Sequence, residues 1–159
     1  MRWKGVAAVA ALIAGVAGAR LSVFDPVRVS SGSMAPTVCT GDLVVIDHLA
    51  PRRGVAVDDI ITFRSPTEGT EQIKRVVAVA GQRVGIADAQ LVVDGREVEE
   101  PYVDLATIDG VYFGPVLVPA GTVFVMGDAR ELSVDSRAFG PVPLDTVDGR
   151  LSGRLWSAC

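Results

Sequence analysis

The pattern of hydrophobic positions changes near residue 24. Residues 5–19 are apolar and uncharged, whereas beyond Phe24 short β-branched runs are separated by Gly, Pro and Asp. A long uninterrupted apolar run is typical of a helix that crosses a bilayer, and short β-branched runs between turn residues are typical of strands. The pattern predicts one membrane segment, residues 1–24, and one domain, residues 25–159.

The second part of the chain predicts an antiparallel, mainly β domain. The runs expected to form strands are residues 43–46, 60–63, 73–79, 91–93 and 123–126. Asp94-Gly95 predicts a two-residue hairpin turn, because both central positions of such a turn need a positive φ. No amphipathic helix pattern and no internal repeat follows the first segment.

The apolar segment predicts a membrane anchor with a cytoplasmic start. Its uncharged run is shorter than the roughly 20 residues that a crossing needs, and it reaches that length if Arg20 extends to the interface. Arg2 and Lys4 favour a cytoplasmic amino terminus, which would place the domain outside the cell. Ala17-Gly18-Ala19 also fits a cleavage site, so a removed secretory signal is the alternative, with the same destination for the domain.

Composition narrows the classes of partner and cofactor. The net charge is -4, and Lys and Arg are scattered, so no basic stripe predicts a nucleic-acid partner. One histidine and two cysteines do not form a metal-ligand set, and we expect no metal and no cofactor. Cys39 and Cys159 are compatible with a disulfide or with two free thiols, and the sequence leaves that open. A monomer is the expected state.

Two segments together suggest nucleophilic catalysis. Residues 30–37 place small hydroxyl residues around a glycine and before a proline, a composition also typical of a simple turn or linker. In the predicted strand 73–79, period-two alternation puts Lys74 on one face with Val76 and Ala78, and both faces are otherwise mainly aliphatic. Loss of hydration would lower its pKa and let it act as the base for Ser33. The alternative is a lysine whose stem packs while its amine reaches solvent.

A third segment, residues 127–137, is rich in charged and hydrogen-bonding groups. Four of its side chains are candidates for one ion-pair cluster: Asp128, Arg130, Asp135 and Arg137. Ser133 would orient the Lys74 amine through its hydroxyl, as the third member that a nucleophile and base commonly use. A solvated surface loop is the alternative interpretation.

A Ser-His-Asp arrangement is the competing catalytic hypothesis. It would combine Ser33 with His48 and with Asp42 or Asp47. His48 follows a predicted strand at a turn, where a single histidine is more often solvated, so the Ser/Lys pair is the preferred hypothesis.

The order of these segments behind an apolar segment resembles the type I signal peptidases, a family of Ser/Lys leader peptidases. Residues 31–37 resemble the nucleophile box, 41–45 the following strand box, 74–77 the base box and 127–137 the last box. The resemblance runs from the apolar segment to about Arg150. It implies a barrel-like antiparallel catalytic domain outside the cell, held in the cell membrane by one helix with a cytoplasmic N-terminus.

The resemblance also implies a function and residue roles. The chain would remove N-terminal signal peptides from exported precursor proteins, cutting after small residues, with those precursors and the lipid bilayer as its partners. Ser33 would attack the scissile carbonyl and Lys74 would take its proton. Ser133 would hold the amine, and Ser31 would help the Ser33 N–H to bind the oxyanion.

The last box carries the supporting residues and one departure. Asp135 and Arg137 would belong to a salt-bridged shell, and Arg130 occupies the motif's Arg position. Ala129 stands where the family usually has Asn, which predicts the loss of one hydrogen bond in that loop.

Three other functions compete with this interpretation. A self-cleaving repressor with a Ser/Lys pair would need a DNA-binding segment, which the sequence does not offer. A β domain that binds a protein partner without catalysis would use Ser33 and Lys74 only structurally. A processing protease dedicated to one substrate would share the chemistry and differ in range.

Overall fold

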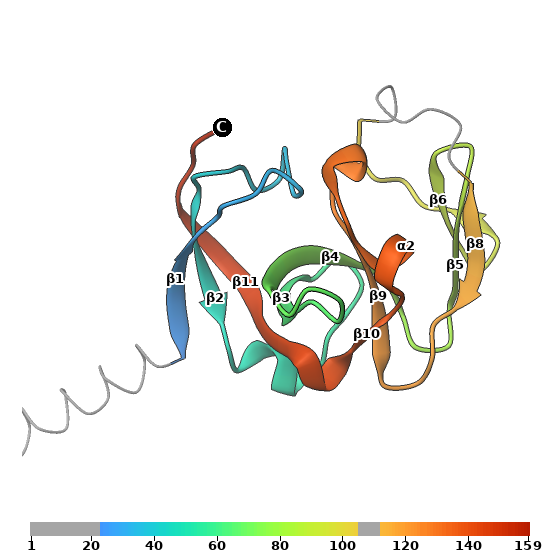
Figure 1. Ribbon diagram of the computed structural model, residues 1–159, viewed down its shortest axis with the longest axis horizontal. Helices are drawn as coiled ribbons and strands as arrows, with labels where there is room; N and C mark the ends of the chain where they lie inside the picture. The colour runs from blue at the N-terminus through green and yellow to red at the C-terminus, as the bar shows by residue number, and fades with distance from the viewer. Residues whose placement is uncertain (1–22, 105–111) are drawn as a thin grey trace, which may run out of the picture.

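The computed structural model describes residues 23–104 and 112–159 (Figure 1). The predicted membrane segment, residues 1–24, therefore lies outside the described residues except for its last two, and Phe24 is the first residue of a strand. Within the described part of the chain, no helix is both long and apolar enough to cross a membrane.

The described residues form two antiparallel sheets, as the sequence pattern predicted. The larger sheet contains, in spatial order, β1 (Phe24–Arg28), β2 (Leu43–Asp47), β11 (Val147–Trp156), β3 (Ile60–Arg64), β4 (Glu71–Val79), β9 (Thr122–Met126) and β10 (Val142–Pro143). The smaller sheet contains β7 (Arg96–Glu97), β6 (Gln90–Val93), β5 (Arg83–Ala87) and β8 (Phe113–Leu117). In Figure 1 the larger sheet curls through the left and centre, and the smaller sheet stands at the right.

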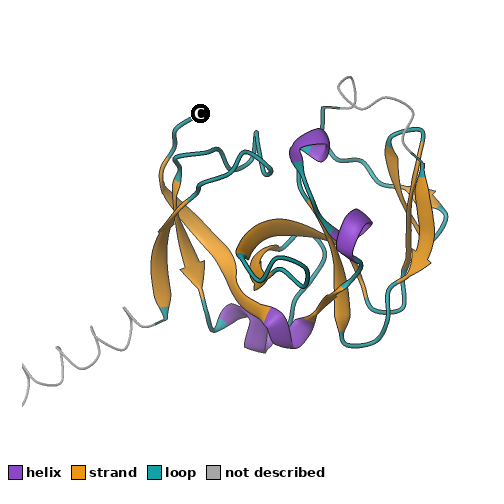
Figure 2. Ribbon diagram, in the orientation of Figure 1, coloured by secondary structure: helices purple, strands orange, loops and turns teal. Residues whose placement is uncertain are grey.

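Helical elements are short throughout the described ranges (Figure 2). They are η1 (Ala50–Arg53), η3 (Arg130–Leu132), α2 (Ser136–Phe139) and η4 (Leu144–Thr146). The expectation of a mainly β domain is confirmed, whereas the barrel is not closed, because β1 and β10 are the two edges of the larger sheet.

The predicted strands correspond to β2, β3, β4, β6 and β9. The Asp94-Gly95 hairpin is also present, with φ values of 52° and 76° between β6 and β7. The longest strand, β11, was missed because its sequence contains two glycines and three charged residues, a composition typical of turns. Gly149 is needed there, since a Cβ at this position would collide with the Ile46 side chain of the neighbouring strand.

β4 differs from the predicted alternation. A register shift between Val76 and Ala78 marks a bulge in its pairing with β9. Val76 packs with the buried residues of the larger sheet, while Val77 and Ala78 pack with Leu91 and other residues of the smaller sheet. The prediction that Ala78 shares a face with Val76 was therefore wrong, and the bulge lets one strand contribute to two cores.

A disulfide connects Cys39 to Cys159 across 120 residues of sequence. Asp42 lies beside it, fully buried, and accepts hydrogen bonds from the backbone N–H of Ala158 (2.6 Å) and of Cys39 (3.0 Å). These bonds, the one from Ala158 first, lower the pKa of Asp42. The structure thus answers the question that the sequence left open and attaches residues 158–159 to the β1–β2 loop.

Candidate active site

Ser33 lies in the loop between β1 and β2. The next residue, Met34, is fully buried in the hydrophobic cluster of the larger sheet, and Val38 joins it there. The backbone N–H of Val38 donates to the Met34 carbonyl at 2.8 Å, which shapes the loop into a turn. Ser33 is 5% exposed, so its hydroxyl is held in a fixed place at the wall of the sheet.

Lys74 reaches Ser33 from the strand β4. Its Nζ donates a hydrogen bond to Ser33 Oγ at 2.7 Å, although 41 residues separate the two in sequence. Lys74 is 4% exposed, and among the described residues it forms no ion pair with a carboxylate. The structure therefore brings together the two residues that the sequence singled out.

Burial lowers the pKa of the Lys74 amine, because the charged form loses its hydration. The negative charges of Asp135 and Glu68 oppose this effect, and the positive charge of Arg137 adds to it. Desolvation is the largest of these effects, so the amine loses its proton at a lower pH than an exposed lysine does. A neutral amine next to a hydroxyl can accept the proton of that hydroxyl.

Ser31 lies near the nucleophile candidate, whereas the Ser133 hydroxyl does not contact Lys74. Ser31 is exposed, and its Oγ is 3.4 Å from Ser33 Oγ. The Ser133 Oγ is buried and has no hydrogen-bond partner within the described residues, so the expected contact with the amine is absent. It lies against Gly127, where a Cβ would come within 2.5 Å of both the Ser133 Cβ and the Ser33 carbonyl oxygen.

Asp135 and Arg137 hold the loop before α2 in one conformation. Asp135 is 1% exposed and accepts from the Gly127 N–H at 3.0 Å and from Arg137 Nε at 2.8 Å. Arg137 also donates to the carbonyl of Arg130 at 2.7 Å. This ion pair fits the supporting place expected for the two residues.

The four charged residues of this segment do not form one cluster. Asp128 pairs with Arg75, and Arg130 pairs with Glu100, while Asp135 and Arg137 pair with each other. The sequence pattern missed Arg75 and Glu100, because the partners lie 53 and 30 residues apart along the chain.

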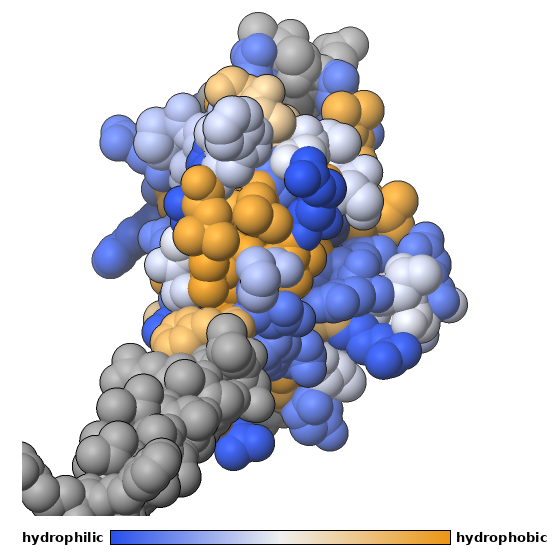
Figure 3. Space-filling view, turned by 90° about the vertical axis from the view of Figure 1, so that its left-hand side faces the viewer, coloured by the Kyte–Doolittle hydropathy of each residue, from blue (hydrophilic) through white to orange (hydrophobic). Residues whose placement is uncertain are grey.

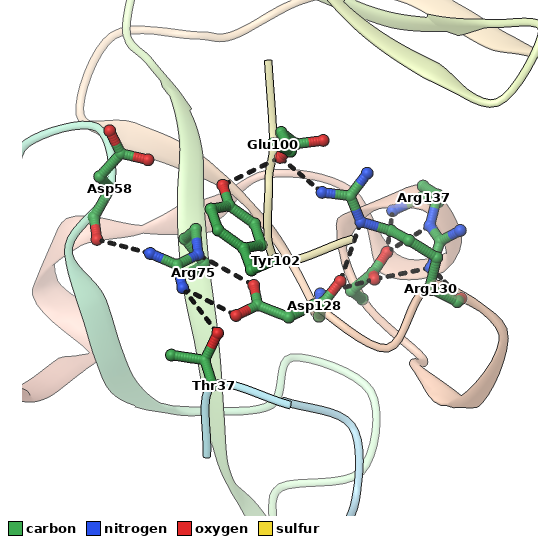
Figure 4. A network of polar contacts seen from close by, with 10 residues as sticks. Thr37, Asp58, Arg75, Glu100, Tyr102, Asp128, Arg130 and Arg137 are labelled. Atoms are coloured by element: carbon green, nitrogen blue, oxygen red, sulfur yellow. Dashed lines mark hydrogen bonds and ion pairs between the residues drawn. The ribbon is translucent and has the colours of Figure 1, made fainter. Parts of the chain in front are cut away.

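Arg75 is the centre of a buried polar network (Figure 4). Its guanidinium donates to both carboxylate oxygens of Asp128, at 2.9 and 2.7 Å, and to Thr37 Oγ1 and the Asp58 carbonyl at 3.3 Å each. The Tyr102 ring covers it, with the guanidinium carbon 3.9 Å from the ring centroid. We call these five residues the Arg75 network. Burial lowers the pKa of Arg75, but its hydrogen bonds and ion pair with Asp128 outweigh burial and raise that pKa.

The competing Ser-His-Asp site is not assembled. His48 Nδ1 lies 3.1 Å from the Asp148 carbonyl oxygen and 3.3 Å from its carboxylate. The Asp47 carboxylate accepts from backbone N–H groups of the residues that follow it, and the Asp42 carboxylate accepts from those of Cys39 and Ala158. The described residues also contain no cluster of three potential metal ligands.

An apolar groove of about 580 Å³ leads to the Ser33–Lys74 pair. Both residues line it, together with aliphatic side chains of β1, β2 and β4, among them Val27, Val44 and Ile73. Seen from the β1 side of the molecule, apolar residues gather into a patch that is framed by hydrophilic ones (Figure 3). A chain segment with small or aliphatic side chains fits such a groove better than a charged one.

Known proteins resemble this chain in sequence. Residues 1–156 match the family model described as "Signal peptidase, peptidase S26". The chain is 33% identical to signal peptidase I of Bacillus caldolyticus over 168 residues, which covers 98% of this chain and 90% of that protein. It is 35% identical to signal peptidase I of Mycobacterium tuberculosis over 192 residues, which covers 84% of this chain and 65% of that protein.

Similarity extends to a plant protein and to a solved structure. The chain is 36% identical to the probable thylakoidal processing peptidase 2 of Arabidopsis thaliana, covering 86% of this chain and 39% of that protein. The crystal structure of a signal peptidase I from Enterococcus faecalis V583 superposes with a TM-score of 0.56 at 31% identity. That match covers 62% of this chain and 97% of the other.

Proposed function

The chain belongs to the S26 family of signal peptidases, and on this premise we propose that it removes signal peptides from exported precursors with Ser33 as nucleophile and Lys74 as general base. One observation carries the assignment of roles: the Lys74 amine lies 2.7 Å from the Ser33 hydroxyl, and both residues are buried at the wall of the groove. No metal or cofactor enters the proposed chemistry.

The proposed reaction proceeds through an acyl-enzyme. Ser33 Oγ attacks the scissile carbonyl carbon while its proton passes to the Lys74 amine, and a tetrahedral oxyanion forms. The C–N bond then breaks, and the leaving amine takes the proton from Lys74. A water molecule attacks the ester, again giving its proton to Lys74, and the Ser33 hydroxyl is regenerated when Lys74 returns that proton.

Four further residues have proposed supporting roles. Ser31 would help the Ser33 N–H to stabilise the oxyanion, and its place 3.4 Å from Ser33 Oγ supports this. Asp135 and Arg137 would keep the loop beside Lys74 in place. Ser133 would orient the amine, which requires its hydroxyl to turn away from Gly127.

The proposed substrates are precursors with small residues before the cut. The aliphatic lining of the groove, with Val27, Val44 and Ile73, leaves shallow subsites suited to such side chains. The disulfide between Cys39 and Cys159 supports a domain outside the cytoplasm, because such bonds persist in oxidising compartments. An anchor near residue 24 would keep Ser33 close to the bilayer, since nine residues extend at most about 30 Å.

A cleavage assay on a precursor with Ala before the cut tests the assignment. Ser33→Ala and Lys74→Met should each lower turnover by at least about 10⁴-fold, because nucleophile and base act as a unit. His48→Ala is the matched control and should keep most of the activity. Turnover by either of the first two variants, measured by mass spectrometry of the products, would defeat the roles given to Ser33 and Lys74.

A further inference from the structure

A short segment between β7 and β8 of the smaller sheet contacts residues that support the Ser33–Lys74 site. Glu100 and Tyr102 lie after β7 and approach Arg75 and Arg130 (Figure 4). Neither residue lines the groove that contains Ser33 and Lys74. Their contacts are therefore with the residues that support the site.

Arg75 joins the elements whose relative position fixes the distance between Ser33 and Lys74. It follows Lys74 in β4, and it donates to Thr37, four residues after Ser33 in the same loop. Its bidentate contact with Asp128 adds the end of β9. A shift of the guanidinium would therefore change the position of the Ser33 loop relative to β4.

Tyr102 contacts the face of the Arg75 guanidinium, whereas Asp128 binds its N–H groups. Its ring lies over Arg75, with 3.9 Å between the guanidinium carbon and the ring centroid, a contact that strengthens when water is excluded. The Tyr102 hydroxyl donates to Glu100 Oε1 at 3.1 Å, which sets the orientation of the ring. Burial first, and then the charge of Glu100, raise the pKa of Tyr102, so the hydroxyl keeps the proton that it donates.

Glu100 is itself held by Arg130. The same oxygen, Oε1, pairs with Arg130 Nη2, and the two side chains are 5% and 2% exposed. Arg130 Nε donates to the Gly127 carbonyl at 2.9 Å, so this contact leads back to the loop beside Ser33. A continuous set of buried contacts thus runs from Glu100 to both sides of the catalytic pair.

We propose that Tyr102 and Glu100 are positioning residues, which hold Arg75 and Arg130 so that Ser33 and Lys74 stay aligned. The inference rests on the proposed function and deepens it, because both residues act through others and touch no substrate. Loss of either should lower kcat and leave KM nearly unchanged, since the groove that binds the precursor is intact. A residue that only stabilises the fold would change neither constant below the unfolding temperature.

The test compares two substitutions of Tyr102 in the full chain. Tyr102→Ala should lower kcat for the Ala-containing precursor by about 10- to 100-fold, with KM within about twofold, as expected for a small misplacement of reacting groups. Tyr102→Phe keeps the ring over Arg75 and should retain most of the turnover. Tyr112→Ala is the matched control, because Tyr112 is 73% exposed and lies outside the Arg75 network.

Glu100→Gln provides a second measurement. The amide oxygen still accepts from the Tyr102 hydroxyl, so kcat should fall by less than in Tyr102→Ala. Glu97→Gln, at an exposed position of β7, should leave kcat unchanged. If Tyr102→Ala fails to fold, Tyr102→Leu replaces it, because leucine keeps apolar volume over Arg75 and lacks the aromatic face; its kcat should also fall.

The outcomes separate this inference from the proposed function. Wild-type kcat in a folded Tyr102→Ala or Tyr102→Leu protein would overturn the positioning role and leave the Ser33 and Lys74 roles intact. Full turnover by Ser33→Ala, or none by the wild type, would overturn the proposed function and the inference with it. Low activity that parallels the unfolded fraction would reduce Tyr102 to a structural role.

Discussion

The Ser33–Lys74 site and the Arg75 network each contain a basic residue of β4, and the two residues are neighbours in the chain. They differ in their partners. Lys74 and Arg75 are 4% and 7% exposed, so both side chains have lost most of their hydration. Arg75 is paired with Asp128 and covered by Tyr102, whereas Lys74 contacts a neutral hydroxyl. The two sites therefore differ in the counter-charge that each cation receives.

The difference explains why one residue is suited to catalysis and its neighbour to support. A guanidinium with a bidentate carboxylate stays charged and fixes the elements around it. An amine in a dry site without such a partner favours its neutral form, which can take a proton. Keeping the Lys74 amine neutral in the folded state costs stability at neutral pH, because the same amine binds a proton readily in the unfolded chain.

Removal of the carboxylate from the Arg75 network should have the largest effect on stability. Asp128→Ala leaves the buried guanidinium without its counter-charge and should lower the free energy of unfolding by about 3–5 kcal/mol. Denaturation in urea measures the change. Asp148→Ala removes an exposed aspartate from its pair with His48 and should change stability by less than about 1 kcal/mol. An equal loss of stability in Asp128→Ala and Asp148→Ala would contradict the role given to the Asp128 carboxylate as the counter-charge of Arg75.

Removal of the Lys74 amine should change the free energy of unfolding in the opposite direction. The pKa of Lys74 is lower in the folded state than its unfolded value of 10.5, so between these two pKa values the unfolded chain binds one more proton, and the folded state loses stability as pH falls through that range. Lys74→Met should therefore raise the free energy of unfolding near pH 7, on the order of 1 kcal/mol. The gain should shrink as pH rises toward 10.5. Arg64→Met, at an exposed position, should show no such pH-dependent difference.

Removal of one negative charge near the Lys74 amine should have the smallest effect, and it should appear in the pH dependence of the rate. Glu68 raises the pKa of Lys74 through its negative charge, in opposition to burial. Glu68→Gln should move the acidic limb of the pH–rate profile to lower pH, because the amine loses its proton more readily. The shift should fade at 1 M salt, since Glu68 is exposed and its field is screened. Asp145→Asn should not move the limb, and an upward shift for Glu68→Gln would contradict the electrostatic explanation.

The sequence predicted the contact between Ser33 and Lys74 better than the contacts around it. Each of the two segments has an ordinary interpretation alone, and Ser33 and Lys74 stand out because the segments occur together in an order that resembles a known family. Arg75 carries no such signal, since its partners Asp128 and Tyr102 are brought to it only by the fold. Local charge density in residues 127–137 predicted one cluster, whereas two of its four charged residues pair with distant partners, and three separate ion pairs result.

The misses in the fold have a similar physical origin. β11 was not predicted because its glycines resemble turn residues. Gly149 is required there by the Ile46 side chain of the adjacent strand, which leaves no space for a Cβ, and the local sequence does not contain this information. The expected contact between Ser133 and Lys74 is also absent. The Ser133 hydroxyl lies against Gly127, and the local sequence does not identify that neighbour. The periodicity of a sequence indicates which residues are apolar. It does not indicate which side chain of another element will lie against a given residue.

The bond between Cys39 and Cys159 has a consequence for biogenesis. Residue 39 lies six positions after Ser33, and its covalent partner is made 120 residues later. The bond can form only when both cysteines have reached the same oxidising compartment. The loop that carries Ser33 therefore gains this covalent attachment only after 120 further residues have been synthesised, and a nascent chain that has not reached residue 159 carries Ser33 on a loop without it.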